Sequence, residues 1–121
     1  MTTCAIRKRI LFIASSSPFF DEQNYQTARM ALSVVMDAEP RLLLKGAALP
    51  LAFHPGSIFP PLYDFFEQER FLREMHVPIM VRARDVERSG RGLHGLRSGV
   101  AVLDREDEAK LYAEMDHILN F

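Results

Sequence analysis

Arginines gather in one stretch of the sequence, and they are the side chains with the clearest potential for chemistry. Five lie within one stretch: Arg82, Arg84, Arg88, Arg91 and Arg97. A guanidinium offers a planar set of donors that suits a carboxylate, a phosphate or the acidic face of a partner protein. The spacing also suits a short helix at 85–89, with Arg84 and Arg88 on one face. A charge run is more often a solvated loop, and anion or partner binding is the alternative.

Three serines form the second candidate. Ser15, Ser16 and Ser17 follow the apolar run Ile10–Ala14, and hydroxyls with free amides ahead of a helix can hold an anion. The loop lacks glycine, however, and matches neither the dinucleotide fingerprint nor the P-loop. A strand-to-helix turn with capping serines is therefore favoured. The candidate ligand- or partner-binding set is Ser15, Ser16, Arg82, Arg84 and Arg88.

Metal and nucleophile chemistry finds little support. The four histidines are widely scattered, without the i, i+3 or i, i+4 spacing of a helical metal site: His54, His76, His94 and His117. A G-x-S-x-G motif is also lacking, and the first strand ends in serines where a phosphorylated receiver module has acidic residues. We expect no metal and no cofactor.

Alternating strand and helix patterns in the sequence predict which elements carry the candidate serines and arginines. Apolar runs bounded by turn residues predict strands at 10–14, 41–45, 77–81, 99–103 and 117–121. Helical periodicity predicts a helix capped by Asp21 and stopped by Pro40, with the stripe Tyr25, Ala28, Leu32, Val35 and Met36. A second helix is expected from Pro60-Pro61 to Met75, with the stripe Leu62, Phe65, Phe66, Leu72 and Met75 and the wet side Glu67, Gln68, Glu69, Arg70 and Arg73.

The last helix is predicted after Asp104, with Asp107 completing a capping box and Ala109, Leu111, Tyr112 and Met115 on the helix. His54–Ser57 reads as a turn, and the state of Ala47–Phe53 is ambiguous. The alternation predicts an α/β fold with a mostly parallel sheet of about five strands and helices on both faces. Ligands of such sheets bind beyond the carboxyl ends of the strands, where the serine loop and Arg82 are expected.

Composition narrows the class of protein. The 121 residues suit one domain spanning 1–121, and a net charge of −1 gives no global attraction to nucleic acid or anionic membrane. Cys4 is the sole cysteine, so an internal disulfide and a thiolate metal cage are both excluded within one chain. No apolar run is long enough for a signal-peptide core or a membrane span. We expect a cytoplasmic protein without nucleic-acid or membrane partners.

Three segments carry a resemblance to a known family. They are Arg9–Ala14 with the loop and helix after it, Val81–Gly90, and Met115–Phe121. In order and spacing they resemble the DsrE/DsrF family, which includes the Tus proteins of the sulfur relay, and most of all its DsrF/TusC branch. The resemblance implies a three-layer α/β/α, flavodoxin-like domain that forms a dimer, trimer or hexamer of equal or mixed subunits.

The residue that carries sulfur in that family is missing. In sulfur-carrying members a strand ends in a cysteine, whose thiolate accepts sulfane sulfur as a persulfide. Counted back from Gly90, Arg82 stands at that position, and Arg84 and Asp85 replace small residues. Cys4 precedes the first strand and is expected at the opposite edge of the sheet. The family's reaction is therefore not expected here.

Two hypotheses follow from the resemblance and the lost cysteine. The first is a non-catalytic subunit of a sulfur-relay or sulfur-metabolism assembly, acting through homo-oligomers or hetero-oligomers with related subunits. The second is a pocket that binds a small anion or nucleotide, or acts on one as an enzyme, built from Ser15, Ser16, Arg82 and Arg84 at the carboxyl ends of the strands. Many phenylalanines, above all in 47–59, raise the alternatives of a buried core or a patch covered by a neighbour.

Overall fold

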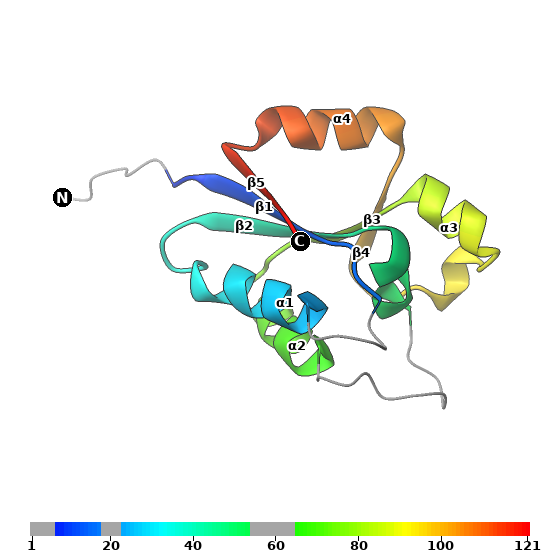
Figure 1. Ribbon diagram of the computed structural model, residues 1–121, viewed down its shortest axis with the longest axis horizontal. Helices are drawn as coiled ribbons and strands as arrows, with labels where there is room; N and C mark the ends of the chain where they lie inside the picture. Colours follow the sequence, from blue (N-terminus) through cyan, green and yellow to red (C-terminus); the bar gives the residue numbers. More distant parts are fainter. Residues whose placement is uncertain (1–6, 18–22, 54–64) are drawn as a thin grey trace.

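A five-stranded parallel sheet is the centre of the fold (Figure 1). The computed structural model describes residues 7–17, 23–53 and 65–121. The strands are β1 (Arg9–Ala14), β2 (Glu39–Leu44), β3 (Ile79–Arg82), β4 (Val100–Leu103) and β5 (His117–Asn120). They lie in the order β4-β3-β2-β1-β5, and each neighbouring pair is parallel. The predicted parallel sheet of five strands is confirmed.

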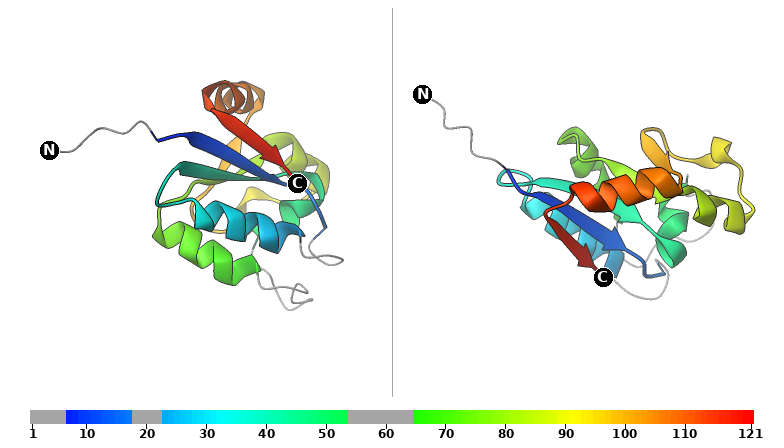
Figure 2. Two further views of the ribbon diagram at one scale, coloured as in Figure 1. Left: turned by 60° about the vertical axis from the view of Figure 1, so that its left-hand side comes forward. Right: turned by 90° about the horizontal axis from the view of Figure 1, so that it is seen from above.

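Helices cover both faces of this sheet, as predicted (Figures 1 and 2). The helices are α1 (Gln23–Ser33), α2 (Phe65–Glu74), α3 (Ala83–Ser89) and α4 (Arg105–Glu114). Helices α1 and α2 lie side by side on one face, α4 lies on the other, and α3 follows the end of β3. The strands β1 and β2 are buried on both faces because they lie between these layers, which explains their continuous apolar runs.

Two apolar cores form on the two faces. The larger core contains Phe12, Leu42, Leu44 and Val81 from the sheet, with Leu72 of α2 against them. The smaller core, under α4, contains Leu11, Ile13, Leu43, Met80 and Leu111. Because successive strand residues point to opposite faces, neighbours such as Leu11 and Phe12 belong to different cores.

The ambiguous segment Ala47–Phe53 falls largely within a 3₁₀ helix, η1 (Gly46–Ala52), and Phe53 pairs with Leu96. A second short 3₁₀ helix, η2, covers Leu93–Gly95. Most of η1 is buried, as is Phe53, so the described part of 47–59 forms core rather than an exposed patch.

The first helix differs from its prediction. Helix α1 ends at Ser33, well before Pro40, and Pro40 lies within β2 opposite Ile10. The predicted stripe is also wrong in part, because Met36 lies beyond the helix and is 75% exposed. The buried side chains are Asn24, Thr27, Ala28 and Ala31. Small residues on this face let the helix approach the sheet closely; the predicted stripe includes Ala28, but periodicity of large apolar residues misses Asn24, Thr27 and Ala31.

The second helix corrects the sequence analysis at Glu69. This residue was assigned to the wet side, yet it is fully buried. Its carboxylate lies 2.7 Å from Nη2 of Arg97 and 3.2 Å from Nε of Arg73, and these two cations offset the cost of burial. Burial in turn lowers the pKa of Arg97. Leu72 is buried as predicted, whereas Met75 lies beyond the helix end and is exposed.

The last helix begins as predicted. The Asp104 carboxylate accepts a 2.7 Å hydrogen bond from the Asp107 amide, and the Asp107 carboxylate accepts one from the Asp104 amide. Leu111 is buried, but Ala109 is exposed and Glu108 is buried instead. Several predicted features lie outside the described residues: Cys4, the Asp21 cap, the turn at His54–Ser57 and the helix start at Pro60-Pro61. In the part of the chain described here, no helix is long and apolar enough to cross a membrane.

His76 adopts a left-handed backbone conformation, with φ of 61°, just beyond α2. Glycine is the usual residue there because it has no Cβ to clash. His76→Gly should therefore raise the free energy of unfolding by about 0.5–1 kcal/mol, after the added chain entropy of glycine is subtracted. Urea unfolding measures the change. Glu74→Gly, at an ordinary helical position, should lower stability, and a loss for His76→Gly would show that its imidazole makes a stabilising contact.

Candidate functional site

The carboxyl end of β3 carries the position that the sequence analysis singled out. Arg82 is the last residue of β3 and the residue before α3, and it is only 8% exposed. Its Nε and Nη2 atoms donate hydrogen bonds of 2.8 Å each to the two carboxylate oxygens of Asp85. This is a bidentate, charge-assisted pair, the strongest arrangement of these two groups.

A second carboxylate, from α4, extends the pair. Glu108 is 6% exposed and accepts hydrogen bonds of 3.2 and 3.3 Å from Nη2 of Arg84. The Tyr112 hydroxyl donates to its Oε2 atom at 2.6 Å, and Nη1 of Arg82 lies 3.8 Å from the same oxygen. We call these five residues the Arg82 cluster: Arg82, Arg84, Asp85, Glu108 and Tyr112.

The cluster shifts the pKa values of its members. Burial alone would raise the pKa of Asp85, but hydrogen bonds from Arg82 and from the Gly46 amide outweigh it, and the pKa is lowered. The hydrogen bond to Asp85 raises the pKa of Arg82. Burial, followed by the hydrogen bond to Glu108, raises the pKa of Tyr112 to about 12. At neutral pH Arg82 and Asp85 are therefore both charged, and Tyr112 is a neutral phenol.

The Arg82 cluster links one strand and several helices through hydrogen bonds, and it does not present reactive groups to solvent. Arg82 belongs to β3, Asp85 to α3 and Glu108 to α4, while Asp85 also accepts a 3.1 Å hydrogen bond from the Gly46 amide of η1. The Asp85 carboxylate occupies the Nε and Nη2 donors of Arg82, and Glu108 lies against Nη1. Since the charges balance within the cluster, little field is left for an external anion.

The two serines lie elsewhere along the same edge of the sheet. Ser15 follows β1, and its hydroxyl donates a 2.6 Å hydrogen bond to the Phe121 carbonyl beyond β5. The Ser16 carbonyl accepts a 2.6 Å hydrogen bond from Asn24 of α1. Strand β2 lies between β1 and β3, so these serines are separated from the Arg82 cluster. Among the predicted site residues, only Arg82 and Arg84 are joined, through Glu108.

Arg88 and Arg91 line a hollow of about 490 Å³ beyond the carboxyl ends of β2 and β3. The short helix α3 was predicted, but Arg84 and Arg88 face different surroundings. Arg84 instead borders a smaller hollow, of about 230 Å³, beside Arg105 and Glu108. Sequence analysis named Arg88 as a candidate binding residue without indicating what surrounds it.

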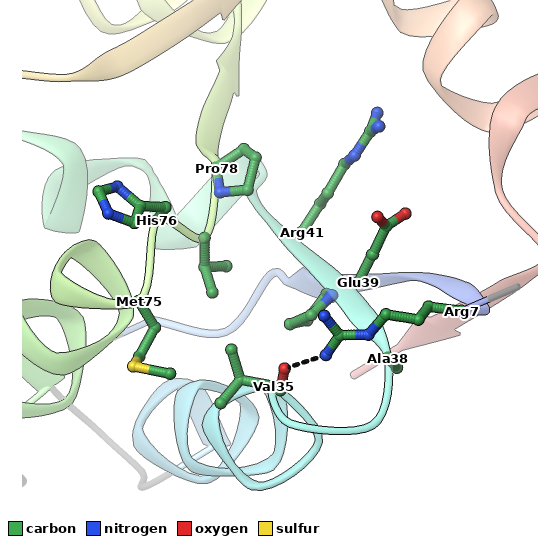
Figure 3. Close-up of a pocket in the computed structure, with 10 residues that line it drawn as sticks. Arg7, Val35, Ala38, Glu39, Arg41, Met75, His76 and Pro78 are labelled. Carbon is green, nitrogen blue, oxygen red and sulfur yellow. Dashed lines mark hydrogen bonds between the residues drawn. The ribbon is translucent and has the colours of Figure 1, made fainter. Parts of the chain in front are cut away.

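A further hollow, of about 270 Å³, lies at the opposite edge of the sheet, where β2 begins (Figure 3). The guanidinium of Arg7 donates a 2.6 Å hydrogen bond to the Val35 carbonyl, and Figure 3 shows Glu39 and Arg41 nearby. Arg41 also pairs with Glu114 at 3.3 Å. Because the basic groups here are already in use, and this is not the edge where such sheets bind ligands, the carboxyl edge is the better candidate.

Sequence reasoning missed the partners of the arginines. Asp85 stands three residues after Arg82, a spacing that allows a pair across a helix start, and this could have been read. Glu108 and Tyr112 stand four apart on α4, next to the buried Leu111. Their contact with Arg82 and Arg84 depends on how α4 packs, which no local signal gives. Within the described ranges no group of three or more potential ligands could hold a metal ion.

Comparison with known proteins supports the fold. No family model matches the sequence, and no curated protein matches it. Among solved structures, the crystal structure of the ychN protein from E. coli is similar, with a TM-score of 0.80 and 19% sequence identity. The match covers 96% of this chain and 100% of that chain. At this identity the match shows the fold, a flavodoxin-like α/β architecture, and nothing further about activity.

Proposed function

We propose that this chain is a DsrE/DsrF-like subunit that works by assembling with copies of itself or with related subunits, and that it carries no sulfur. The ychN structure, whose fold is of the DsrE/TusC type, supports the family placement at the level of fold. The placement in the DsrF/TusC branch rests on the sequence segments alone. A cytoplasmic location is part of the proposal, since a chain with one cysteine suits a reducing compartment.

The observation that carries this proposal is the environment of Arg82. The residue stands where a strand ends and a helix begins, the position at which sulfur-carrying members hold their cysteine. A bidentate bond to Asp85 fixes its side chain, and Glu108 lies behind it. A persulfide needs a nucleophilic thiolate, and no group of the Arg82 cluster can supply one.

Exposed apolar side chains support assembly. Ile118 and Leu119 are 44% and 38% exposed on β5, which is an edge strand of the sheet. Met30 of α1 and Phe71 of α2 are also large and exposed. An edge strand with free backbone groups and apolar side chains is a surface that proteins usually cover. In the proposed assembly, a neighbouring subunit covers these apolar side chains and the edge strand.

The alternative pocket built from Ser15, Ser16, Arg82 and Arg84 has less support. Both guanidiniums already contact carboxylates, and the serines lie on the other side of β2. An anion would have to compete with Asp85 and Glu108 for each arginine. We therefore retain assembly as the function that the geometry supports best.

Native mass spectrometry, before and after treatment with a persulfide donor, tests the proposal. The expected result is an oligomer whose subunit mass gains no sulfur. Cys4→Ser should behave in the same way, because Cys4 has no role in the proposal. A monomer would contradict the assembly, and a mass increase of one sulfur atom that disappears in Cys4→Ser would show that the chain carries sulfur by another route.

A further inference from the structure

Two arginines differ from the rest of the arginine-rich stretch. Arg82, Arg84 and Arg97 each contact a buried carboxylate. The guanidiniums of Arg88 and Arg91, by contrast, have no acidic partner among the described residues, and both residues are exposed. Free guanidiniums that stand close together in the fold are the groups most able to hold an external anion.

The hollow beside them has a mixed lining. Its 490 Å³ falls in the range of small-molecule sites. Ala47, Leu49 and Pro50 of η1 supply an apolar wall, while Arg88, Ser89 and Arg91 supply polar groups from the end of α3 and the loop after it. The hollow lies beyond β2 and β3, at the edge where ligands of parallel sheets bind.

The positive charge of this hollow is not cancelled by Asp85, the one acidic residue among the described residues that line it. Both carboxylate oxygens of Asp85 accept hydrogen bonds from Arg82, and one accepts a further bond from the Gly46 amide. A contact with an aromatic ring holds the Arg91 side chain in place, since its guanidinium lies 4.9 Å from the centre of the Phe53 ring. A ring contact of this kind holds the cation while leaving its donors free.

We propose that this hollow binds a small organic anion, a molecule with an apolar ring or chain and one carboxylate or phosphate group. Arg88 and Arg91 bind the charged group, and the η1 residues Ala47, Leu49 and Pro50 contact the apolar part. Such a site requires neither a sulfur-carrying thiol nor assembly, so it goes beyond the function proposed above and is independent of it.

Isothermal titration calorimetry with three probes tests this site. Phenyl phosphate, benzoate and benzyl alcohol share a ring but differ in the attached group. At least one of the two anions should bind about tenfold or more tightly than the neutral alcohol, because charge-assisted bonds to two arginines distinguish them. The anion that binds more tightly shows whether the site prefers a phosphate or a carboxylate. Equal binding of benzyl alcohol, or no detectable binding of either anion, would overturn the proposal.

Variants locate the binding. Arg88→Gln combined with Arg91→Gln should weaken the tighter anion by about tenfold or more. The matched control is Arg70→Gln, since Arg70 is an exposed arginine that also lies over a ring, that of Phe71, away from the hollow. The affinity of the Arg70→Gln variant for the same anion should equal that of the unaltered protein. An anion that binds the double variant as tightly as the unaltered protein would place the site elsewhere and overturn the inference, whatever native mass spectrometry shows about assembly.

Discussion

Replacement of Asp85 by alanine should lower the free energy of unfolding by about 3–5 kcal/mol, because it leaves a buried cation without its partner. Asp85 is 6% exposed and accepts both short hydrogen bonds from Arg82 and the bond from the Gly46 amide. Glu108 lies 3.8 Å from Arg82 and offsets only part of the loss. Urea unfolding followed by circular dichroism measures the change.

Two further variants make the result interpretable. Glu106→Ala removes an exposed pair with Lys110, at 4.0 Å, and should change stability by less than about 0.5 kcal/mol. Arg82→Leu with Asp85→Leu removes both charges and should recover most of the stability lost in Asp85→Ala. If Asp85→Ala costs no more than Glu106→Ala, the buried pair does not hold β3, α3 and η1 together, and our account of the cluster is wrong.

The same residue should govern stability in acid. The pKa of Asp85 is lowered from its ordinary value of 3.8, so the folded state binds this proton less readily than the unfolded chain. Its contribution is complete above pH 3.8 and is lost as the pH falls through the lower, folded value. The Arg82→Leu/Asp85→Leu variant should therefore lose less stability below pH 3.8 than the unaltered protein does.

The fold was accessible from sequence because its strongest signals are local. Continuous apolar runs such as Ile10–Ala14 indicate strands buried on both faces, and Asp104 with Asp107 marks a helix start through contacts three residues apart. The end of α1 was missed because Pro40 was read as a helix stop. In the structure a turn precedes it, and the proline is tolerated within β2.

The site was less accessible because its partners are distant in sequence. Glu69 was assigned to solvent by helical periodicity, and its burial depends on Arg97, which arrives from the loop before β4. Arg82 was correctly placed at a strand end, but its engagement with Glu108 depends on the packing of α4. Residue type and spacing identify charged groups, whereas their free or paired state is a property of tertiary packing.

A cysteine introduced at position 82 should not by itself confer sulfur transfer. Arg82→Cys in a Cys4→Ser background should lower the free energy of unfolding by about 3–5 kcal/mol, because Asp85 loses the partner of both its oxygens. Two carboxylates then face one guanidinium, that of Arg84, and the excess negative charge raises the pKa of the new thiol. At neutral pH the variant should gain little sulfur from a persulfide donor by mass spectrometry.

Removing the unpaired carboxylate should change that outcome. Arg82→Cys with Asp85→Ala, again with Cys4→Ser, leaves Glu108 paired with Arg84 and places the thiol near a guanidinium, which favours the thiolate. This variant should be more stable than Arg82→Cys alone and should gain the mass of one sulfur atom. Arg105→Cys, at an exposed position on α4, shows how much the introduction of a cysteine by itself changes folding. If Arg82→Cys alone accepts as much sulfur as the variant that also lacks Asp85, the carboxylates do not control the reactivity of a thiol at this position, and our account of the Arg82 cluster is wrong.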